Sequence, residues 1–511
     1  MEHVVVYHET GRFAGWPANN GLWSWDDGEV VVGFTRSFFE EKPGHSDRPP
    51  RENLLARSLD GHHWAVEKPQ GFFRLDAVYA DREEALELIE STAPFDFSSD
   101  GFMMRVVGAH YHGAAEPRGA FLCSRDRGRS WEGPFAFRVR DLPPELRPGK
   151  GARWTARTDV VLLGPNDALV LCSARCDEYV PSDRVFALRT TDGAQTFSFA
   201  SWVVPPADPY RAVMPATVQL DNGDLVTAIR RRQIDGDKCW IDAFGSTDGG
   251  RTWSFRGRVG YTGGSNGNPP ALAVLADGRL CTVFGERCRS KLLARYSADG
   301  GHTWTEETVL RSDYQPDSSG FRDLGYPRLT RRPDASMLAI YYWATSLRPE
   351  PHIAATMWRP QATPSVHIAQ HLELVSVSTD MPYELDIADA GVCAYIDRDY
   401  VITELPQRLC NATLLRTANE DDRVDAADHV VLELERPHIL TVALRVEGTS
   451  LPGWLFEWED SGERLSTTDT RSGADFRLYH RRVSSGRVML GGTERDATGI
   501  PGAWFAFATP D

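Results

Sequence analysis

Charged and aromatic residues recur at the ends of apolar segments in this 511-residue sequence. They are Arg36, Arg175, Arg230, Glu286 with Arg287, and Tyr342 with Trp343. A planar guanidinium can bind a carboxylate through two parallel hydrogen bonds. A nearby Tyr or Glu side chain could act as a nucleophile or a base. Together these residue types favour chemistry on an acidic ligand.

A second set of residues precedes the same segments. It comprises Trp16-Pro17-Ala18, Arg157-Thr158-Asp159, Met214-Pro215-Ala216, Pro269-Pro270-Ala271 and Tyr326-Pro327-Arg328. A turn rich in Asp, Asn or Gly follows each of these leading tripeptides, and the apolar segment ends about eight residues later. The chain therefore repeats one unit, with equivalent residues at both positions.

The elements that must position these residues are indicated by a repeated phrase. It reads Ser124-x-Asp126-x-Gly128-x-Ser130-Trp131, and it recurs from Ser246 to Trp253 and from Ser297 to Trp304. Weaker copies run from Thr190 to Phe197, with Ala194 in place of glycine, and from Ser58 to Trp64, one residue short. Asp and Ser or Thr bind the backbone of a turn, Gly supplies an unusual conformation, and Trp packs the hairpin. The phrase therefore predicts a hairpin, and turn chemistry accounts for its Asp residues without catalysis.

Five copies of one hairpin predict an all-β fold with a β-propeller, in which equivalent positions of successive blades surround one axis. We expect six blades over residues 1–365, with the N-terminal segment pairing with the last blade to close the ring. The leading tripeptides and segment ends should then face a common mouth, where function is expected.

Residues 374–511 lack the phrase and alternate as short strands, for example over 430–434 and 441–444. Turns every 8 to 12 residues predict a smaller β-sandwich, with a carbohydrate-binding or structural role. Trp454, Trp458 and Trp504 could form a sugar platform, but core packing is the better interpretation because large aromatics usually fill cores.

Composition excludes several function classes. The net charge of −16 argues against nucleic acid as a partner, and no apolar run is long enough to predict a membrane partner. Eight Cys without a CxxC pair favour thiols in a reducing compartment over disulfides or metal ligands. The start of the chain lacks a secretory signal, which predicts a cytoplasmic protein, or a secreted one if a signal has been trimmed. No cofactor or metal is implied, and the oligomeric state is left open.

With the phrase and the arginines in place, residues 1–365 resemble the sialidase (neuraminidase) superfamily of six-bladed, Asp-box propellers. The resemblance implies an exo-glycosidase that removes a terminal acidic sugar, sialic acid or a related 2-keto-3-deoxy sugar acid, from a glycan. It also implies three arginines on the sugar carboxylate, a Tyr nucleophile assisted by a Glu, and a loop Asp as acid/base.

Carried over residue by residue, the resemblance assigns the acid/base to Asp47, which lies eleven residues before Ser58 as in the family. It assigns two carboxylate-binding arginines to Arg230 and Arg289, and the nucleophile to Tyr326. A neutral phenol suits an anionic substrate, because a carboxylate nucleophile would be repelled.

Two positions depart from the family pattern. The Glu partner of the Tyr would align with Met214, and the first-blade arginine would align near Gly15. Glu286 would then have to serve as the base, and Arg12 or Arg328 could complete a displaced triad. We expect the substrate to contact side chains from the whole set: Arg12, Trp16, Arg36, Met214, Arg230, Arg289 and Arg328.

Two other functions fit the same scaffold, and the first is a polysaccharide lyase or a glycosidase that acts on uronate-containing glycans. A lyase acting on uronate glycans needs cations to neutralise a carboxylate and a Tyr or His to move a proton, and His110-Tyr111-His112 could supply such groups. The two His side chains of that tripeptide could also suit a metal, although exposed or hydrogen-bonded histidines are the simpler interpretation. A non-catalytic glycan-binding propeller, with Met214 marking lost activity, is the second alternative.

Overall fold

The structure is a computed structural model of the chain. It describes residues 1–72, 87–108, 118–147, 152–175, 182–234, 238–264, 266–305, 307–360, 372–410, 412–421, 424–445, 451–468, 475–493 and 504–510, without the side chains of 156–158 and 510. The chain divides into two compact units, which are Met1–Trp304 with Thr308–Ala362, and Thr305–Glu307 with Thr363–Asp511.

The described residues of unit 1 form six sheets, which follow one another along the chain. The first three comprise β2 (Arg12–Gly15), β3 (Leu22–Ser24), β4 (Val30–Phe39), β5 (Asp47–Ser58) and β6 (Ala65–Glu67); then β7 (Met103–Val107), β8 (Ala120–Ser124) and β9 (Glu132–Phe135); then β10 (Val139–Arg140), β11 (Arg153–Leu162), β12 (Ala168–Arg175), β13 (Asp183–Thr190) and β14 (Phe197–Trp202).

The next three sheets each hold four strands. They comprise β15 (Arg211–Gln219), β16 (Leu225–Arg232), β17 (Cys239–Ser246) and β18 (Ser254–Tyr261); then β19 (Ala271–Val274), β20 (Leu280–Glu286), β21 (Lys291–Ser297) and β22 (Thr308–Arg311); then β23 (Gly325–Arg331), β24 (Met337–Thr345), β25 (Arg348–Trp358) and β1 (Glu2–Tyr7). Pairing within the sheets is antiparallel, except for β10 with β14.

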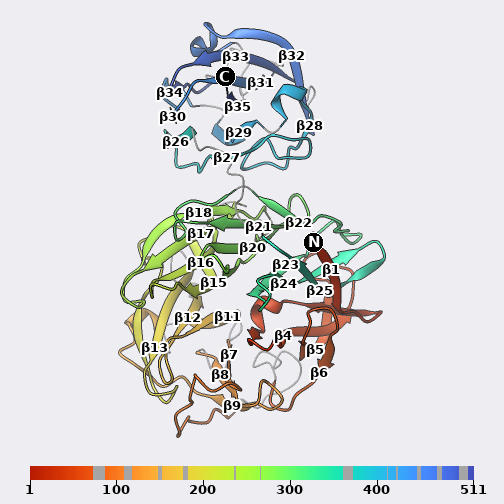
Figure 1. Cartoon of the computed structure of the whole chain (residues 1–511), viewed down its shortest axis with the longest axis vertical. Coiled ribbons are helices and arrows are strands. Elements are labelled where there is room, and N and C mark those ends of the chain that lie inside the picture. The colour runs from red at the N-terminus through yellow and green to blue at the C-terminus, as the bar shows by residue number, and fades with distance from the viewer. Residues whose placement is uncertain are drawn as a thin grey trace. The chain divides into compact units, whose positions relative to one another are not determined.

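The six sheets lie in a ring (Figure 1). Their strands are rich in Val, Leu, Ile and Phe, which suit a sheet buried on both faces. A separate cluster of buried apolar side chains lies between each sheet and the next, and the last cluster joins the sixth sheet to the first. Unit 1 is therefore a β-propeller, as predicted. The number of blades stays a prediction, because residues 73–86 and 109–117 are not described.

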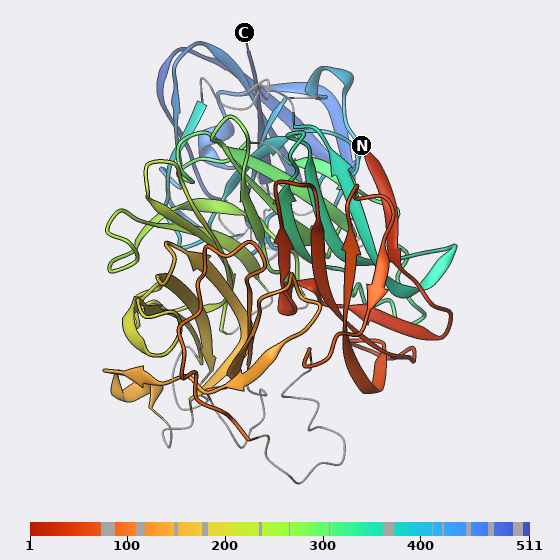
Figure 2. The same ribbon diagram turned by 60° about the horizontal axis from the view of Figure 1, so that its bottom comes forward.

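The ring closes through the N-terminal strand, as predicted. β1 pairs antiparallel with β25, with Glu2 opposite Met357. Figure 2 shows this strand, in red, beside the green-blue strands of the sixth sheet. Sheet hydrogen bonds thus tie residues from the two ends of unit 1 together.

The repeated phrase forms the predicted hairpin at all five places. In the first full copy, Ser124 Oγ accepts a bond of 2.9 Å from the Gly128 amide, and Asp126 Oδ1 accepts one of 2.9 Å from the Ser130 amide. The weaker copies keep the first contact, because the amides of Ala194 and Gly61 donate to the hydroxyls of Thr190 and Ser58.

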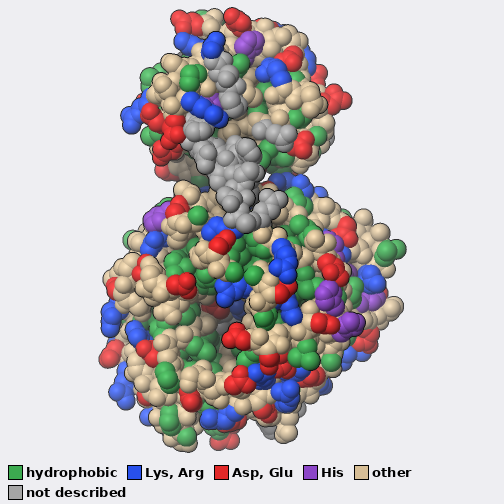
Figure 3. Space-filling view, viewed as in Figure 1, with side chains coloured by type: hydrophobic (Ala, Val, Ile, Leu, Met, Phe, Trp, Pro, Cys, Tyr) green, Lys and Arg blue, Asp and Glu red, His purple; other side chains and the backbone are tan. Residues whose placement is uncertain are grey.

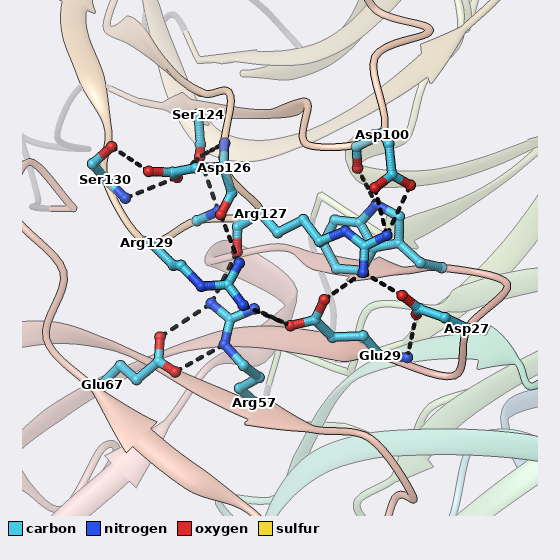
Figure 4. A network of polar contacts seen from close by, with 12 residues as sticks. Asp27, Glu29, Arg57, Glu67, Asp100, Ser124, Asp126, Arg127, Arg129 and Ser130 are labelled. Carbon is cyan, nitrogen blue, oxygen red and sulfur yellow. Dashed lines mark hydrogen bonds and ion pairs between the residues drawn. The ribbon is translucent and has the colours of Figure 1, made fainter.

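One residue of the phrase also joins two sheets. Arg127 Nη1 lies 2.5 Å from Asp27 Oδ2 and 2.6 Å from Glu29 Oε2, and Nη2 lies 2.6 Å from Asp100 Oδ2 (Figure 4). Arg57 binds the other oxygen of Glu29 at 2.6 Å. The buried Glu29 carboxylate of the first sheet is therefore held by the hairpin of the second.

Unit 2 contains two sheets in its described part, and the sandwich stays a prediction. One sheet holds β26 (Leu372–Val377), β30 (Val430–Leu434) and β34 (Gly486–Leu490); the other holds β27 (Glu384–Ile387), β28 (Ile402–Glu404), β29 (Thr413–Arg416), β31 (His438–Arg445), β32 (Glu459–Thr467), β33 (Asp475–Val483) and β35 (Trp504–Pro510). Trp454 packs edge-on against both Trp458 and Trp504, and these last two are buried. This favours core packing over a sugar platform.

Helical structure among the described residues is limited to five 3₁₀ turns: η1 (Pro17–Asn19), η3 (Pro144–Leu146), η4 (Gln407–Leu409), η5 (Asn419–Asp421) and η6 (Gly453–Leu455). In the described parts of the chain, none of the helices is long and apolar enough to cross a membrane. Cys123, Cys172, Cys281 and Cys410 carry free thiols, which agrees with the prediction for these four residues.

Candidate active site

Three leading residues adopt the same unusual backbone conformation. Trp16, Met214 and Tyr326 each precede a proline, each is buried, and each has a positive φ, of 59°, 59° and 48°. The pairing of β15 with β16 and of β23 with β24 shifts register at Met214 and Tyr326. Bulky residues avoid this left-handed region unless their surroundings impose it, and such strain is concentrated at functional sites.

The three residues also lie in one cluster with Tyr342 and Phe13. Trp16, Met214 and Tyr326 come from different sequence repeats of unit 1, and they lie together as predicted. The strain itself was not predictable, because nothing in the tripeptides distinguishes a bulge from a regular strand.

Arg230, from the end of β16, connects two of these residues. Its Nη1 lies 3.4 Å from the Tyr326 hydroxyl and 3.6 Å from Met214 Sδ, and its Nη2 donates to the carbonyl of Asn266. Arg230 is 6% exposed. The predicted pair of Tyr326 and Arg230 is thus in direct contact, and the positive charge stabilises negative charge on the phenol oxygen.

A buried amide that the sequence analysis missed fixes the position of Tyr326. Asn268 Oδ1 accepts a bond of 2.8 Å from the Tyr326 amide, and its Nδ2 donates to the Leu324 carbonyl at 2.8 Å. Asn268 lies directly before Pro269, and a single Asn in that context carries no signal of such a role.

A second polar group lies beside Tyr326. The His45 ring, on the segment between β4 and β5, lies with Nδ1 2.9 Å from Asp323 Oδ2. Asp323 is 3% exposed, accepts a bond from the Tyr342 hydroxyl, and has Arg287 Nη2 3.5 Å from its Oδ1. The ring of Tyr342 lies 5.9 Å from that of Tyr326. Asp323 and His45 were not predicted as site residues.

The charged side chains in this group shift the pKa values of one another. Burial alone would raise the pKa of Asp323, but His45 and Arg287 hold it below its usual value. Burial lowers the pKa of His45, but the charge and hydrogen bond of Asp323 outweigh it and leave this pKa above the ordinary value. The Tyr326 phenol acts on His45 in the same direction as Asp323.

Trp16 lies against this group. Its ring meets the His45 ring edge-on at 5.0 Å, and the Arg51 guanidinium lies 5.8 Å from its centre. The space-filling view shows that one face of unit 1 is hollowed near the middle of the ring, with apolar, basic and acidic side chains around the hollow (Figure 3). An apolar ring beside exchangeable protons suits a sugar face.

Asp47, predicted as the acid/base, is 1% exposed at the start of β5. Arg51 Nε donates to its Oδ2 at 2.5 Å, and Lys42 Nζ donates to its backbone carbonyl. Its neighbour His45 has a side chain that is 43% exposed. The geometry therefore favours His45 over Asp47 for contact with a ligand.

Glu286 and Arg289 are bound to each other. Glu286 Oε2 accepts bonds from the Arg289 amide at 2.6 Å and from Arg289 Nε at 3.1 Å, and Oε1 accepts one from the Cys288 amide at 3.1 Å. These contacts tie the Glu286 carboxylate to its own turn. Its role as base for Tyr326 stays a prediction.

Arg36 and Arg12 lie in a different set of contacts. Arg36 donates to Glu52, Glu9 and the Tyr7 hydroxyl. Arg12 lies 3.5 Å from Glu9 and over the Phe38 ring at 4.1 Å. These partners differ from Tyr326, Arg230 and His45, so the contacts among the described residues do not bring the two arginines into the group.

Arg328 lies in yet another place, although it follows Tyr326 by two residues. Its Nη1 lies 3.2 Å from Asp159 Oδ1, and its Nη2 donates to the Ala18 carbonyl at 2.7 Å. Burial raises the pKa of Asp159, although Arg328 opposes this. Both side chains line a cavity of about 130 Å³ that Arg105 also borders.

The tripeptide His110-Tyr111-His112 lies outside the described residues. Within the described ranges, no group of three or more His, Cys, Asp or Glu side chains could hold a metal ion. The candidate site is therefore the group around Tyr326: Trp16, His45, Met214, Arg230, Arg287, Asp323 and Tyr342.

The fold is a β-propeller whose hairpins are formed by the repeated phrase. The candidate site is a cluster of polar and aromatic side chains around Tyr326. A family described as "BNR repeat-like domain" matches residues 76–340. The chain belongs to this family. No curated protein matches this chain.

Solved structures are similar to this chain. A protein of unknown function from Dyadobacter fermentans DSM 18053 is 21% identical, with a TM-score of 0.50 over 70% of this chain and 97% of that one. An α-L-arabinanase from Penicillium chrysogenum is 12% identical, with a TM-score of 0.45 over 70% and 98%. A sialidase from Streptococcus pneumoniae is 14% identical, with a TM-score of 0.43 over 70% of each chain.

Proposed function

We propose that this protein is a glycoside hydrolase that removes a terminal acidic sugar, sialic acid or a related 2-keto-3-deoxy sugar acid, from a glycan. The observation that carries the proposal is the contact between Arg230 and the buried Tyr326, whose backbone is strained. A fixed phenol beside a guanidinium suits a nucleophile that works next to an anionic group.

Two cations support binding of the sugar carboxylate. Arg230 lies at the Tyr326 hydroxyl. Arg287 lies close to Asp323 and to the Tyr342 hydroxyl. Because a carboxylate nucleophile would be repelled by such a substrate, a phenol is the suitable group. Arg287 is therefore a second candidate for carboxylate binding beside the predicted Arg289, and each of the two guanidiniums also lies against a buried carboxylate.

Met214 determines how the nucleophile can be activated. Its thioether contacts Arg230 where a carboxylate would be expected from the resemblance, and Glu286 is bound to its own turn, so in this proposal the Tyr326 proton leaves to water. Arg230 stabilises the phenolate that results. We expect turnover slower than with a carboxylate base at this position, and we expect it to rise with pH until the acid group loses its proton.

A lyase acting on uronate glycans is a second candidate. The specific observation in its favour is that His45, Tyr326 and Arg287 lie close enough to interact electrostatically, with Arg230 at the Tyr326 hydroxyl. Such a group could neutralise a carboxylate and move the neighbouring proton. An unsaturated product that absorbs in the ultraviolet would identify this activity.

The test is release of fluorophore from aryl glycosides of sialic acid, other 2-keto-3-deoxy sugar acids and uronic acids. We expect turnover of one acidic sugar by the wild type and a loss of at least about 100-fold in Tyr326→Phe. Tyr210→Phe is the control, because Tyr210 packs against Trp240 without contact to this group. Silence across the panel, including the lyase assay, would leave a glycan-binding propeller.

A further inference from the structure

The segment between β4 and β5 carries His45, whose ring is oriented by contacts with a buried carboxylate and with Trp16. His45 Nδ1 lies 2.9 and 3.0 Å from the two oxygens of Asp323, and Trp16 meets the ring edge-on at 81°. The side chain is 43% exposed, whereas Asp323 is buried. Because Nδ1 is directed at the carboxylate, Nε2 is the nitrogen left to donate to a ligand.

We propose that His45, positioned by Asp323, is the general acid that protonates the leaving group in this site. The inference rests on the proposed function, and it deepens it by assigning the proton donor to a residue other than Asp47. Asp323 is a positioning residue, because it acts through His45.

Contacts from other parts of the propeller hold Asp323 in place. The Tyr342 hydroxyl of β24 donates to it, and Arg287 approaches the same oxygen. The Tyr314 hydroxyl donates to its backbone carbonyl at 3.4 Å. A carboxylate held by two side chains, on a residue whose backbone carbonyl is also bound, can fix the tautomer and the direction of the imidazole that contacts it.

The other charges that face His45 come from several segments. Asp323 and the Tyr326 phenol favour the imidazolium, and Arg287 opposes it. On its own segment, Ser46 donates to Asp317, and Asp47 is bound by Arg51. The Trp16 ring packs on it from the side of the first leading tripeptide. Opposite charge therefore outweighs burial and like charge, which raises the pKa of His45 above its ordinary value and favours its protonated form.

Hydrolysis takes two steps in this proposal. The Nε2 proton moves to the glycosidic oxygen as the bond from that oxygen to the anomeric carbon breaks, and the bonding electrons leave with the departing alcohol. The Tyr326 oxygen bonds to the anomeric carbon, and its proton goes to water. In the second step, neutral His45 takes a proton from the attacking water, and the phenolate leaves and regains a proton from solvent.

The leaving group separates this role from a structural one. Wild type and His45→Asn would be compared on a dinitrophenyl glycoside and an alkyl glycoside of sialic acid. An alkyl alcohol needs protonation to depart, so we expect kcat/KM for it to fall at least about 100-fold, and less than about 10-fold for the dinitrophenyl substrate. His63→Asn is the matched control, because His63 Nδ1 also binds a carboxylate, Asp60, at 2.7 Å, but its side chain is 92% exposed.

A second measurement concerns Asp323. In Asp323→Asn we expect the alkaline limb of the pH–rate profile, and the His45 titration followed by NMR, to move to lower pH. Equal losses on both substrates in His45→Asn, or no loss, would overturn the role of His45 while the proposed function stands. A wild type without turnover of either glycoside would overturn both. His45→Asn alone carries the test if Asp323→Asn does not fold.

Discussion

Arg230 and Tyr326 come from different sheets of the propeller and meet with Nη1 3.4 Å from the phenol oxygen. The same guanidinium contacts Met214, so one side chain links two of the strained leading residues. The contact determines where an anionic sugar and a nucleophile could meet.

Arg230→Gln should therefore weaken catalysis on an acidic sugar. Because charge-assisted hydrogen bonds contribute about 1.5–3 kcal/mol, we expect kcat/KM to fall roughly 10- to 100-fold. Steady-state kinetics would measure it, with Arg251→Gln as the control on an exposed hairpin. An unchanged kcat/KM for Arg230→Gln would argue against carboxylate binding at this site.

Asp47→Asn should act on stability and leave the pH profile of activity unchanged. The carboxylate is buried and bound by Arg51, so its loss leaves that guanidinium without its partner and lowers the free energy of unfolding by about 1–3 kcal/mol. Denaturant unfolding and a pH–rate profile would measure the two effects. A selective loss on the alkyl glycoside in this variant would return the acid role to Asp47.

Arg127→Met should destabilise the junction of the first two sheets. The variant leaves Glu29 with Arg57 but removes the contacts with Asp27 and Asp100, so we expect the free energy of unfolding to fall by about 2 kcal/mol (Figure 4). Arg129→Met is the matched control, because its side chain is 58% exposed and 3.6 Å from Glu29. Equal effects of the two variants would contradict the bridging role.

The hairpins should contribute a pH-dependent stability. A hydrogen bond from Thr252, with backbone amide bonds, lowers the pKa of Asp248 from 3.8 to about 2. Since the folded pKa is the lower one, this stabilisation is present above about pH 4 and is lost as the pH falls toward 2. Asp248→Asn should flatten the dependence of unfolding free energy on pH in that range. Asp221→Asn, on an exposed turn, should leave the slope as in the wild type.

Local patterns made the hairpins predictable. Each copy of the phrase binds its own backbone, so even Ala194 takes the left-handed conformation of the missing glycine, with a φ of 67°. The predicted strand over 430–434 coincides with β30 for the same reason, because side-chain alternation is a short-range signal.

The site was only partly predictable, because it depends on contacts far apart in the sequence. His45 and Asp323 are 278 residues apart, and no local pattern relates them. The burial of Asp47 against Arg51 and the pairing of Glu286 with Arg289 depend on how each turn folds. Tyr326 and Arg230 were chosen as candidates because they occupy repeated positions, which the propeller brings toward one axis, and because the resemblance assigns roles to both.

The most direct test of the central claim is trapping a glycosyl-enzyme intermediate on Tyr326. A sugar acid with fluorine beside the anomeric carbon and fluoride as leaving group slows the second step, because the transition state resembles an oxocarbenium ion. We predict that mass spectrometry of digested protein finds one sugar mass on the peptide that contains Tyr326, and none in Tyr326→Phe. Turnover of the natural glycoside with no adduct on Tyr326, or an adduct on another residue, would contradict the account.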